Sequence, residues 1–389
     1  MKRQNKVFTL SVAAAAVSFA MFSAAHAESV KIGVNQPLTG AVAASGNYIL
    51  QGAKIAADEI NAKGGINGKT IELVVEDNKS NPTESANVTE KLIVRDKVPV
   101  LMGAWGSTFT LAAMPKLMEY KVPMVVETSS SVKITKSGNP YVFRLAPTSE
   151  IEANEFAPYI KQLNIKKADL LVVNNDWGRG AAAEFRRVLE ANGVTVGKEL
   201  IMDAAAQDMT SQLSDIRSDD ADTLFVTTAV EQLTLLLKQA QSLGLKRQII
   251  TTGGSQNPDQ LIEQAGSATE GTMHLLFFTP WEPDATSHPE MSKAFIEEWN
   301  KRGNNFAGLT ESFRGYDGIK TIAAAIGQAK EITPAGIKDA LWNVKLQGLN
   351  GDISFRKEGE GDKASAQYDA NTYLVVVKDG KVHAVPKAK

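Results

Sequence analysis

Two kinds of segment alternate along this chain of 389 residues: short runs of β-branched and apolar residues, and longer segments with helical periodicity. Residues 30–34 form the first expected strand. Apolar residues spaced three or four apart follow between 49 and 60, as on one buried face of a helix. Further runs at 70–76 and 98–102 continue this order, which begins again after Pro147. Alternating strands and helices are typical of parallel sheets covered by helices. The sequence therefore predicts an α/β fold with two lobes, each a parallel sheet flanked by helices.

Proline and glycine positions predict where several of these elements begin and end. Asn257-Pro258, His288-Pro289 and Thr333-Pro334 each place a proline at the first position of an expected helix. The C-terminal segment 372–385 alternates apolar and polar residues around Asp379-Gly380, which indicates a β-hairpin. No Pro- or Ser-rich linker separates the two units, so we expect ordered crossings between them.

The amino terminus has the three parts of a secretory signal peptide. Lys2, Arg3 and Lys6 precede an apolar run at 7–22, and Ala25-His26-Ala27 follows as a small-residue cleavage site. The apolar run is shorter than the roughly 20 residues that a membrane-spanning helix needs. We therefore expect residues 1–27 to be removed and a soluble mature protein to be released into the periplasm.

Composition excludes several classes of function. The formal net charge of −2 is not that of a nucleic-acid-binding protein. The chain contains no cysteine, so disulfides, thiolate metal sites, cysteine nucleophiles and lipid attachment through cysteine are all excluded. We expect no metal and no cofactor.

Two glycine-rich segments resemble nucleotide-binding motifs but have the wrong context. Residues 64–70 follow an expected helix and enter a strand, whereas a phosphate-binding loop leaves a strand and begins a helix. Gly178, Gly180 and Ala183 have the spacing of a dinucleotide fingerprint, but three residues separate Gly178 from the preceding strand. The few histidines lie in no catalytic or metal-binding spacing, so the sequence predicts a protein that is not an enzyme.

Hydroxyl-bearing loops follow two neighbouring strands. Residues 104–108 come after the strand expected at 98–102, and residues 128–131 come after the one at 122–126. Hydroxyl groups next to helix N-termini are suited to binding a carboxylate, although the same residues also serve as ordinary helix caps. We interpret the two loops together as one side of a ligand site.

Six segments resemble type I periplasmic solute-binding proteins, in particular the leucine/isoleucine/valine-binding family of branched-chain amino-acid ABC transporters. The resemblance extends over essentially the whole mature chain and is clearest in these segments: KIGVNQPLTG at 31–40, QGAKIAADEINAKGGINGKTIELVVED at 51–77, GNPYVFRLAP at 138–147, WGRG at 177–180, LKQAQSLGL at 237–245 and AGSATEG at 265–271.

This resemblance implies two lobes joined by three hinge crossings, near Pro147, Leu276 and Phe355. Lobe 1 would comprise residues 28–147 and 277–354, and lobe 2 residues 148–276 and 355–389. The family encloses its ligand between the lobes by hinge closure, which removes the ligand from water.

The resemblance also implies a set of ligand-binding residues. In lobe 1 the carboxylate of the ligand would be bound by two loops, and Ser45 would stand where an aromatic residue often covers the ligand. In lobe 2 Trp177 would take the place of a pocket tyrosine. The two lobe 1 loops supply Trp105, Gly106, Ser107, Thr128, Ser129 and Ser130.

Two positions depart from the family pattern. Amino-acid receptors of this family bind the ligand's ammonium through an acidic residue in the loop that here reads Gly-Gly-Ser-Gln-Asn at 253–257, with Ser255 at its centre and no carboxylate. Ala229 stands where a pocket aromatic is expected. An enclosed ammonium without a counter-charge is costly. Either Glu231 or Glu127 could substitute for the missing carboxylate.

The sequence thus predicts a monomeric periplasmic receptor that captures a small carboxylate-bearing solute and delivers it to the membrane permease subunits of an ABC importer. Branched-chain or other amino acids, aliphatic or aromatic acids and amides all remain candidate ligands. A ligand-sensing receptor domain for signalling is the alternative, since the same fold serves that role.

Overall fold

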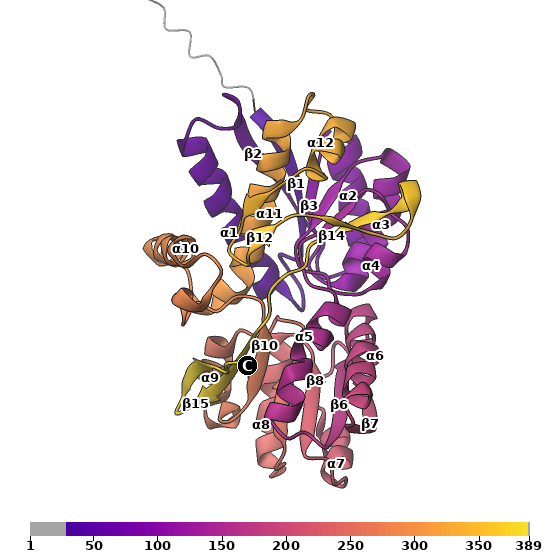
Figure 1. Cartoon of the computed structure of the whole chain (residues 1–389), viewed down its shortest axis with the longest axis vertical. Coiled ribbons are helices and arrows are strands. Elements are labelled where there is room, and N and C mark those ends of the chain that lie inside the picture. Colours follow the sequence, from indigo (N-terminus) through magenta and orange to yellow (C-terminus); the bar gives the residue numbers. More distant parts are fainter. Residues whose placement is uncertain (1–28, 388–389) are drawn as a thin grey trace, which may run out of the picture.

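The computed structural model describes residues 29–387, so the expected signal peptide at 1–27 lies outside the described residues. Two seven-stranded sheets dominate this part of the chain, one above the other in Figure 1. We call each sheet with its helices a lobe. The predicted α/β fold class is confirmed, with the difference that both sheets are mixed and only mainly parallel.

Lobe 1 contains the sheet with strand order β13-β14-β5-β4-β3-β1-β2, in which only the β13–β14 pair is antiparallel. Its strands are β1 Ser29–Gln36, β2 Thr70–Asp77, β3 Leu101–Gly103, β4 Met124–Val126, β5 Val142–Arg144, β13 Arg356–Glu358 and β14 Ser365–Gln367. Its helices are α1 Ala43–Ala62, α2 Pro82–Val94, α3 Ser107–Tyr120, α4 Lys133–Lys136, α10 Pro289–Lys301, α11 Leu309–Gln328 and α12 Pro334–Leu341. A separate two-stranded sheet pairs β11 Leu346–Gln347 with β12 Asp352–Ile353.

Lobe 2 contains the sheet with strand order β16-β15-β10-β9-β8-β6-β7. Its strands are β6 Lys167–Val173, β7 Thr195–Met202, β8 Thr223–Thr227, β9 Gln248–Thr251, β10 Met273–Leu276, β15 Tyr373–Lys378 and β16 Lys381–Ala384. Its helices are α5 Ser149–Gln162, α6 Asp176–Ala191, α7 Thr210–Arg217, α8 Val230–Ser242 and α9 Pro258–Ala265. Across both lobes, short 3₁₀ turns occur at Gly266–Thr269, Pro283–Ala285, Phe306–Gly308 and Gly361–Lys363.

The proline and turn signals read from the sequence agree with these elements. Helices α9, α10 and α12 each begin at the proline that the sequence marks. Strands β15 and β16 form the expected C-terminal hairpin around Asp379-Gly380. Gly178 lies in the first turn of α6. A side chain there would place its Cβ 2.0 Å from the carbonyl oxygen of Val173, so glycine lets α6 start close to β6.

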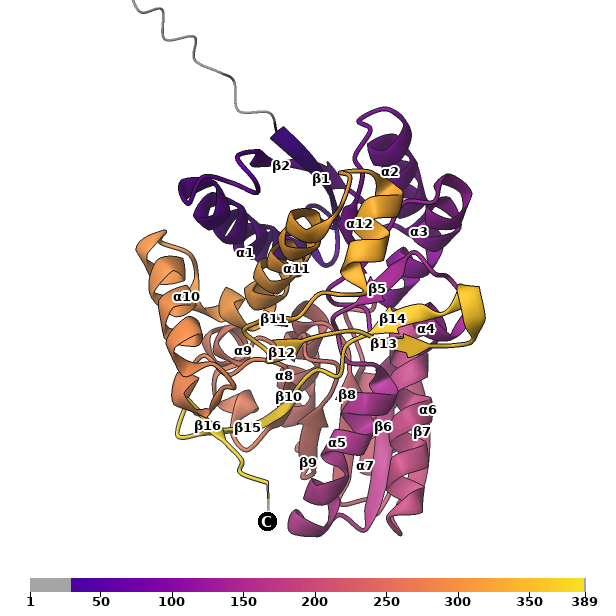
Figure 2. The ribbon, with the colours of Figure 1, turned by 45° about the horizontal axis from the view of Figure 1, so that its top comes forward.

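The strand pairing moves the third crossing away from Phe355. Strand β14 pairs in parallel with β5 through Ala366 and Phe143, and β13 pairs with β14, so residues 356–367 belong to the sheet of lobe 1. The third crossing, from lobe 1 to lobe 2, therefore lies between β14 and β15 (Figure 2). The predicted boundary at Phe355 is therefore corrected. Ala366 of β14 is buried and packs in the hydrophobic core of lobe 1.

Hydrogen bonds tie the three crossings to one another. Nδ2 of Asn350 donates to the carbonyl oxygen of Phe277 at 2.5 Å and to that of Asn371 at 3.0 Å. Nε2 of Gln367 donates to the carbonyl oxygen of Ala146 at 2.9 Å. These hydrogen bonds therefore connect the three crossing segments to one another.

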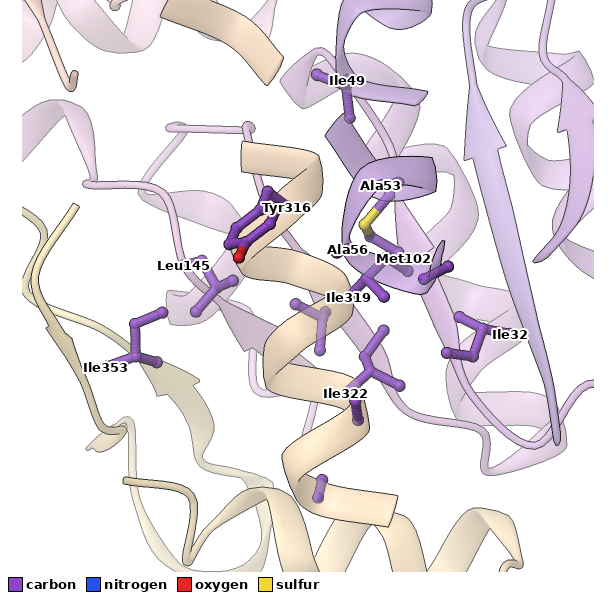
Figure 3. Packing of buried hydrophobic residues seen from close by; sticks show 14 of the residues in the cluster. Ile32, Ile49, Ala53, Ala56, Met102, Leu145, Tyr316, Ile319, Ile322 and Ile353 are labelled. Atoms are coloured by element: carbon purple, nitrogen blue, oxygen red, sulfur yellow. The ribbon is translucent and has the colours of Figure 1, made fainter. Parts of the chain in front are cut away.

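Helices α1 and α11 pack so closely that their backbones touch. A Cβ on Gly52 would lie 1.9 Å from the carbonyl oxygen of Ser312, and a Cβ on Gly315 would lie 2.0 Å from that of Ile49. Around this contact the isoleucines of α11 fill the core of lobe 1 (Figure 3). Glycine usually weakens a helix interior, so its presence on both helices reflects the need for close approach.

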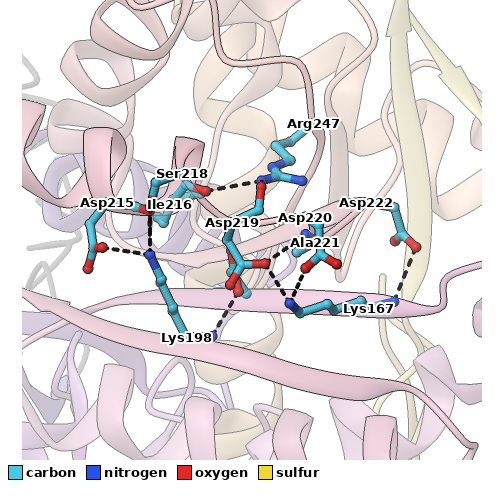
Figure 4. A network of polar contacts seen from close by, with 11 residues as sticks. Lys167, Lys198, Asp215, Ile216, Ser218, Asp219, Asp220, Ala221, Asp222 and Arg247 are labelled. Atoms are coloured by element: carbon cyan, nitrogen blue, oxygen red, sulfur yellow. Dashed lines mark hydrogen bonds and ion pairs between the residues drawn. The ribbon is translucent and has the colours of Figure 1, made fainter.

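A polar network closes the end of lobe 2 where β6 begins (Figure 4). Nζ of Lys198 lies 2.6 Å from Oδ1 of Asp215, and Lys167 pairs with Asp219 and Asp220. Arg247 donates to the carbonyl oxygens of Ile216, in the last turn of α7, and Asp219, just after it. The network ties the turn after α7 to strands β6 and β7, well away from the loops at the opposite ends of the strands.

The glycine contact leads to a stability prediction. Gly315→Ala should lower the free energy of unfolding by about 1–3 kcal/mol, because the added methyl group meets backbone that cannot move aside. Gly327→Ala on the same helix is the matched control, since its Cβ would lie 3.6 Å from Ile66. It should be neutral or stabilise by up to about 1 kcal/mol through helix propensity. Urea unfolding of both variants is the measurement, and equal effects would contradict the close-contact explanation.

Candidate ligand-binding site

A cavity of about 490 Å³ is lined by residues of both lobes. Lobe 1 contributes the loop after β3 and the start of α3, and lobe 2 contributes the starts of α6 and α8. The lining residues are Ala41, Val42, Ser80, Pro82, Trp105, Gly106, Ser107, Thr108, Phe109, Val173, Asn175, Trp177, Ala204, Ala205, Ala206, Gln207, Thr228, Ala229, Glu231, Gln232 and Leu235. These loops follow the carboxyl ends of parallel strands, where open α/β sheets bind ligands.

Two tryptophans from opposite lobes meet beside this cavity. The rings of Trp105 and Trp177 are 6.3 Å apart between centroids and inclined at 70°, an edge-to-face arrangement. A second cavity of about 10 Å³ adjoins them and is lined by Trp105, Gly106, Ser107, Thr128, Ser129, Ser130, Trp177, Gly253 and Ser255. Since both tryptophans line both cavities, the indole pair stands where the two spaces meet.

The structure brings together most of the residues expected at the site. Ala229 lines the larger cavity, and Ser255 lines the smaller one beside the hydroxyl loops. Ser45 lines neither of them. It lies in the first turns of α1, fully buried, where Gly46 approaches the carbonyl oxygen of Pro37.

The hydroxyl groups differ in what remains available to a ligand. Oγ of Ser129 donates to the carbonyl oxygen of Ala104 at 2.8 Å. Oγ of Ser107 instead accepts a hydrogen bond from the backbone N–H of Ser131 at 3.1 Å, so its proton remains free to donate. Buried Arg144 holds the same loop by donating to the carbonyl oxygens of Ser129 and Ser131. Ser107 at the start of α3 is therefore the better anchor for an anion.

An ion pair on α11 was not identified from the sequence. Glu311 and Arg314 are 0% and 2% exposed, and Nε of Arg314 lies 3.2 Å from Oε2 of Glu311. The guanidinium lies over the ring of Phe277 at 5.0 Å, and Nη2 donates to the carbonyl oxygen of Gly254 at 2.6 Å. Opposite charges three residues apart were the available signal, but Asp317 and Lys320 on the same helix have the same spacing, so the signal did not single out this pair.

Burial raises the pKa of several carboxyl groups near the cleft. It raises the pKa of Glu127 to about 7, although Gln36 donates to Oε1 of Glu127 at 2.6 Å. Burial likewise raises the pKa of Glu311, and the Arg314 charge partly offsets this. The pKa of Glu231 is raised to about 7 by burial and by the neighbouring Glu311. Each of these groups is thus costly to ionise without a nearby cation.

Polar contacts join the lobes on both sides of the cleft. Oγ1 of Thr108 donates to Oδ2 of Asp176 at 3.1 Å, and Nζ of Lys133 lies 3.1 Å from Oδ1 of the same aspartate. On the other side Thr310 of α11 donates to Asn257, next to the bond between Arg314 and Gly254. The lobes therefore contact each other through α3 and α6 and through α11 and the 253–257 loop.

Neither a metal centre nor a membrane-spanning helix is found in the described region. Residues 29–387 hold no group of three or more histidine, aspartate and glutamate side chains placed to bind a metal ion. No helix in that region is both long enough and apolar enough to cross a membrane.

The fold and the cleft together define a two-lobed binding protein. The Periplasmic binding protein family matches residues 29–381, and the chain belongs to this family, in the branch of leucine/isoleucine/valine-binding proteins of ABC transport. The resemblance seen in the sequence is confirmed. The family consists of binding proteins, so the prediction that the chain is not an enzyme is confirmed as well.

Similar proteins cover nearly the whole chain. The Leu/Ile/Val-binding protein BraC3 of Rhizobium johnstonii is 31% identical over 317 residues, 80% of this chain and 82% of that protein. The substrate-binding protein LivJ from Streptococcus pneumoniae, solved with isoleucine, is 27% identical with a TM-score of 0.78, covering 92% of this chain and 99% of its own. A solute-binding protein of R. palustris, solved with 4-hydroxybenzoate, is 25% identical with a TM-score of 0.78, covering 93% and 96%.

Buried Glu152 of α5 leads to a prediction of pH dependence. It accepts a hydrogen bond from the backbone N–H of Gly253, and burial raises its pKa from 4.5 to about 8. The folded chain therefore keeps a proton that the unfolded chain releases above about pH 4.5. The stability linked to that proton is lost as the pH rises through about 8.

Glu152→Gln should make the melting temperature fall less between about pH 6 and about pH 9, because the amide imitates the protonated acid. Thermal unfolding across this range is the measurement. Exposed Glu297 supplies the control, since Glu297→Gln should follow the parent curve. If the melting temperatures of the parent and of Glu152→Gln changed equally with pH, Glu152 would not be the source of the pH dependence.

Proposed function

We propose that this chain is the solute receptor of an ABC importer. It is exported to the periplasm through the signal peptide at 1–27, binds a small carboxylate-bearing organic solute between its lobes by hinge closure, and passes it as a monomer to membrane permease subunits. The observation that carries the proposal is the cavity of about 490 Å³ lined by both lobes, with two indoles and Ser107 in its walls. Cavities of this size suit small organic ligands.

The start of α3 supplies the anion-binding chemistry. The first N–H groups of a helix have no partner within the helix, and the helix dipole favours negative charge there. Gly106 precedes α3 with a φ of +92°, a conformation that glycine adopts without strain. Ser107 adds a hydroxyl with a free proton at the same point. A carboxylate at this position would be bound by backbone and side chain together.

The indole pair and the alanines suit the hydrocarbon part of the solute. Trp105 and Trp177 are 5% and 7% exposed, and the small side chains of Ala204, Ala205 and Ala206 line the same cavity. The ligands of the two solved relatives, isoleucine and 4-hydroxybenzoate, differ in shape but both join a carboxylate to an apolar body. That shared chemistry supports the proposed class of solute, which includes amino acids and aromatic acids.

Removing the hydroxyl of Ser107 tests this proposal. Ser107→Ala should weaken carboxylate binding about 10- to 100-fold, because a hydrogen bond to a charged group is lost. Isothermal titration with leucine, phenylalanine and benzoate is the measurement. Ser107→Thr, which keeps a hydroxyl, should bind almost as well as the parent.

Ser242→Ala, at the far end of α8, is the matched control and should leave the dissociation constant unchanged. Thermal unfolding of each variant distinguishes a local effect from loss of the Ser131 contact. Equal affinities of Ser107→Ala and the parent would contradict the anchor at α3. Binding by none of the three carboxylates would contradict the proposed class of solute.

A further inference from the structure

The larger cavity has a single ionisable side chain among the described residues that line it, and that side chain is acidic. Glu231 lies in the first turn of α8, on the lobe 2 side. No lysine, arginine or histidine shares the lining. An anionic group placed at this end of the cavity would face a carboxylate with no compensating positive charge.

One oxygen of the Glu231 carboxylate is buried without a partner. The carboxylate accepts a hydrogen bond from its own backbone N–H, whereas its Oε2 is buried and accepts none from the described residues. Acidic residues are common in the first turn of a helix, where the dipole stabilises them. The helix start thus accounts for one oxygen and leaves Oε2, which faces no cation among the described residues, for a ligand.

Two other acidic residues near the cleft do not line the larger cavity. Glu311 is paired with Arg314 and interacts with Ser255 and Trp105 beside the smaller cavity. Glu127 accepts from Gln36 and lines a separate cavity of about 20 Å³ beside Pro147 and Phe277. Of the two substitutes that the sequence suggested for the missing carboxylate of the 253–257 loop, only Glu231 faces the larger cavity.

The surroundings of Glu231 are suited to a cation. Trp105 and Trp177 line the same cavity, and the faces of indole rings attract ammonium groups when water is excluded. A carboxylate and aromatic rings that line one cavity are a combination suited to binding organic amines. Ser107 lines the cavity from lobe 1 and Glu231 from lobe 2, so one molecule with opposite charges could contact both.

We propose that Glu231 is a specificity-determining residue that binds a protonated amine of the ligand, so that the preferred solute is an amine-bearing carboxylic acid. This inference rests on the proposed function. It assigns the counter-charge to the helix after β8, in place of the loop after β9 that the family pattern indicates. Glu231 selects against simple carboxylic acids of the same hydrocarbon skeleton.

Two matched series of ligands test this inference by isothermal titration with the mature protein. The first comprises leucine, 4-methylpentanoate and 3-methylbutylamine; the second comprises phenylalanine, 3-phenylpropanoate and 2-phenylethylamine. Within each series the second compound lacks the amine and the third lacks the carboxylate. The amino acid of at least one series should bind about 10- to 100-fold more tightly than the acid without an amine.

Glu231→Gln should abolish this preference by weakening the amino acid while leaving the simple acid unchanged or tighter. Glu263→Gln, an exposed glutamate on the neighbouring helix α9, is the matched control and should behave as the parent. Equal binding of amino acid and simple acid, unaffected by Glu231→Gln, would overturn the role of Glu231 and leave the proposed function standing. Binding of no compound in either series would overturn both.

Discussion

The close contact between α1 and α11 determines where the remaining parts of the cleft lie. Gly52 and Gly315 let the two helix backbones meet, so α11 sits deep against lobe 1 with its first turns directed toward lobe 2. Thr310 and Arg314 in those turns contact the loop 254–257 of lobe 2. A larger residue at either glycine would push α11 outward and move these contacts with it. The interface between the lobes thus depends on the packing inside one of them.

Arg314 explains why the buried carboxylates at this interface are not equivalent. Burying a guanidinium is costly unless it is paired, and this one has the Glu311 carboxylate, the carbonyl oxygen of Gly254 and the ring of Phe277 as partners. Its charge also opposes the rise in pKa of Glu127 and Glu152. Glu231 receives no such compensation from Arg314 and is instead repelled by Glu311. Glu231 therefore differs from Glu127 and Glu152 in that no described cation offsets the effect of burial on its pKa.

The sequence predicted those features of the fold that depend on residues close together in the chain, and it missed those that depend on pairing between distant segments. The alternation of elements, the prolines that begin α9, α10 and α12, and the C-terminal hairpin all follow from short-range patterns, and the structure agrees with them. Strands β13 and β14 are only three residues long, and β14 joins them to the sheet by pairing with β5 far away in the chain, so no local pattern marks them. The third crossing was misplaced for the same reason.

The candidate site shows the same division between local and long-range information. Loops after strands can be recognised locally, and Trp105, Ser107 and Trp177 do line a common cavity. Whether a hydroxyl group can donate to a ligand depends on partners far away in the chain. The hydroxyl of Ser129 donates to the carbonyl oxygen of Ala104, whereas that of Ser107 accepts from the N–H of Ser131 and can still donate its own proton. The pair formed by Glu311 and Arg314 reaches the site only through the packing of α11, which no spacing in the sequence reveals.

In the proposed receptor, the opposite chemical character of the two walls would give hinge closure a physical cause. The lobe 1 wall, with the start of α3 and Ser107, favours negative charge, and the lobe 2 wall, with Glu231, favours positive charge. A ligand with one charge contacts one wall well and leaves the other imperfectly satisfied. A ligand with both charges gains its second interaction only when the lobes approach, so its binding energy is coupled to closure. Under this proposal, selectivity and conformational change would arise from the same pair of contacts.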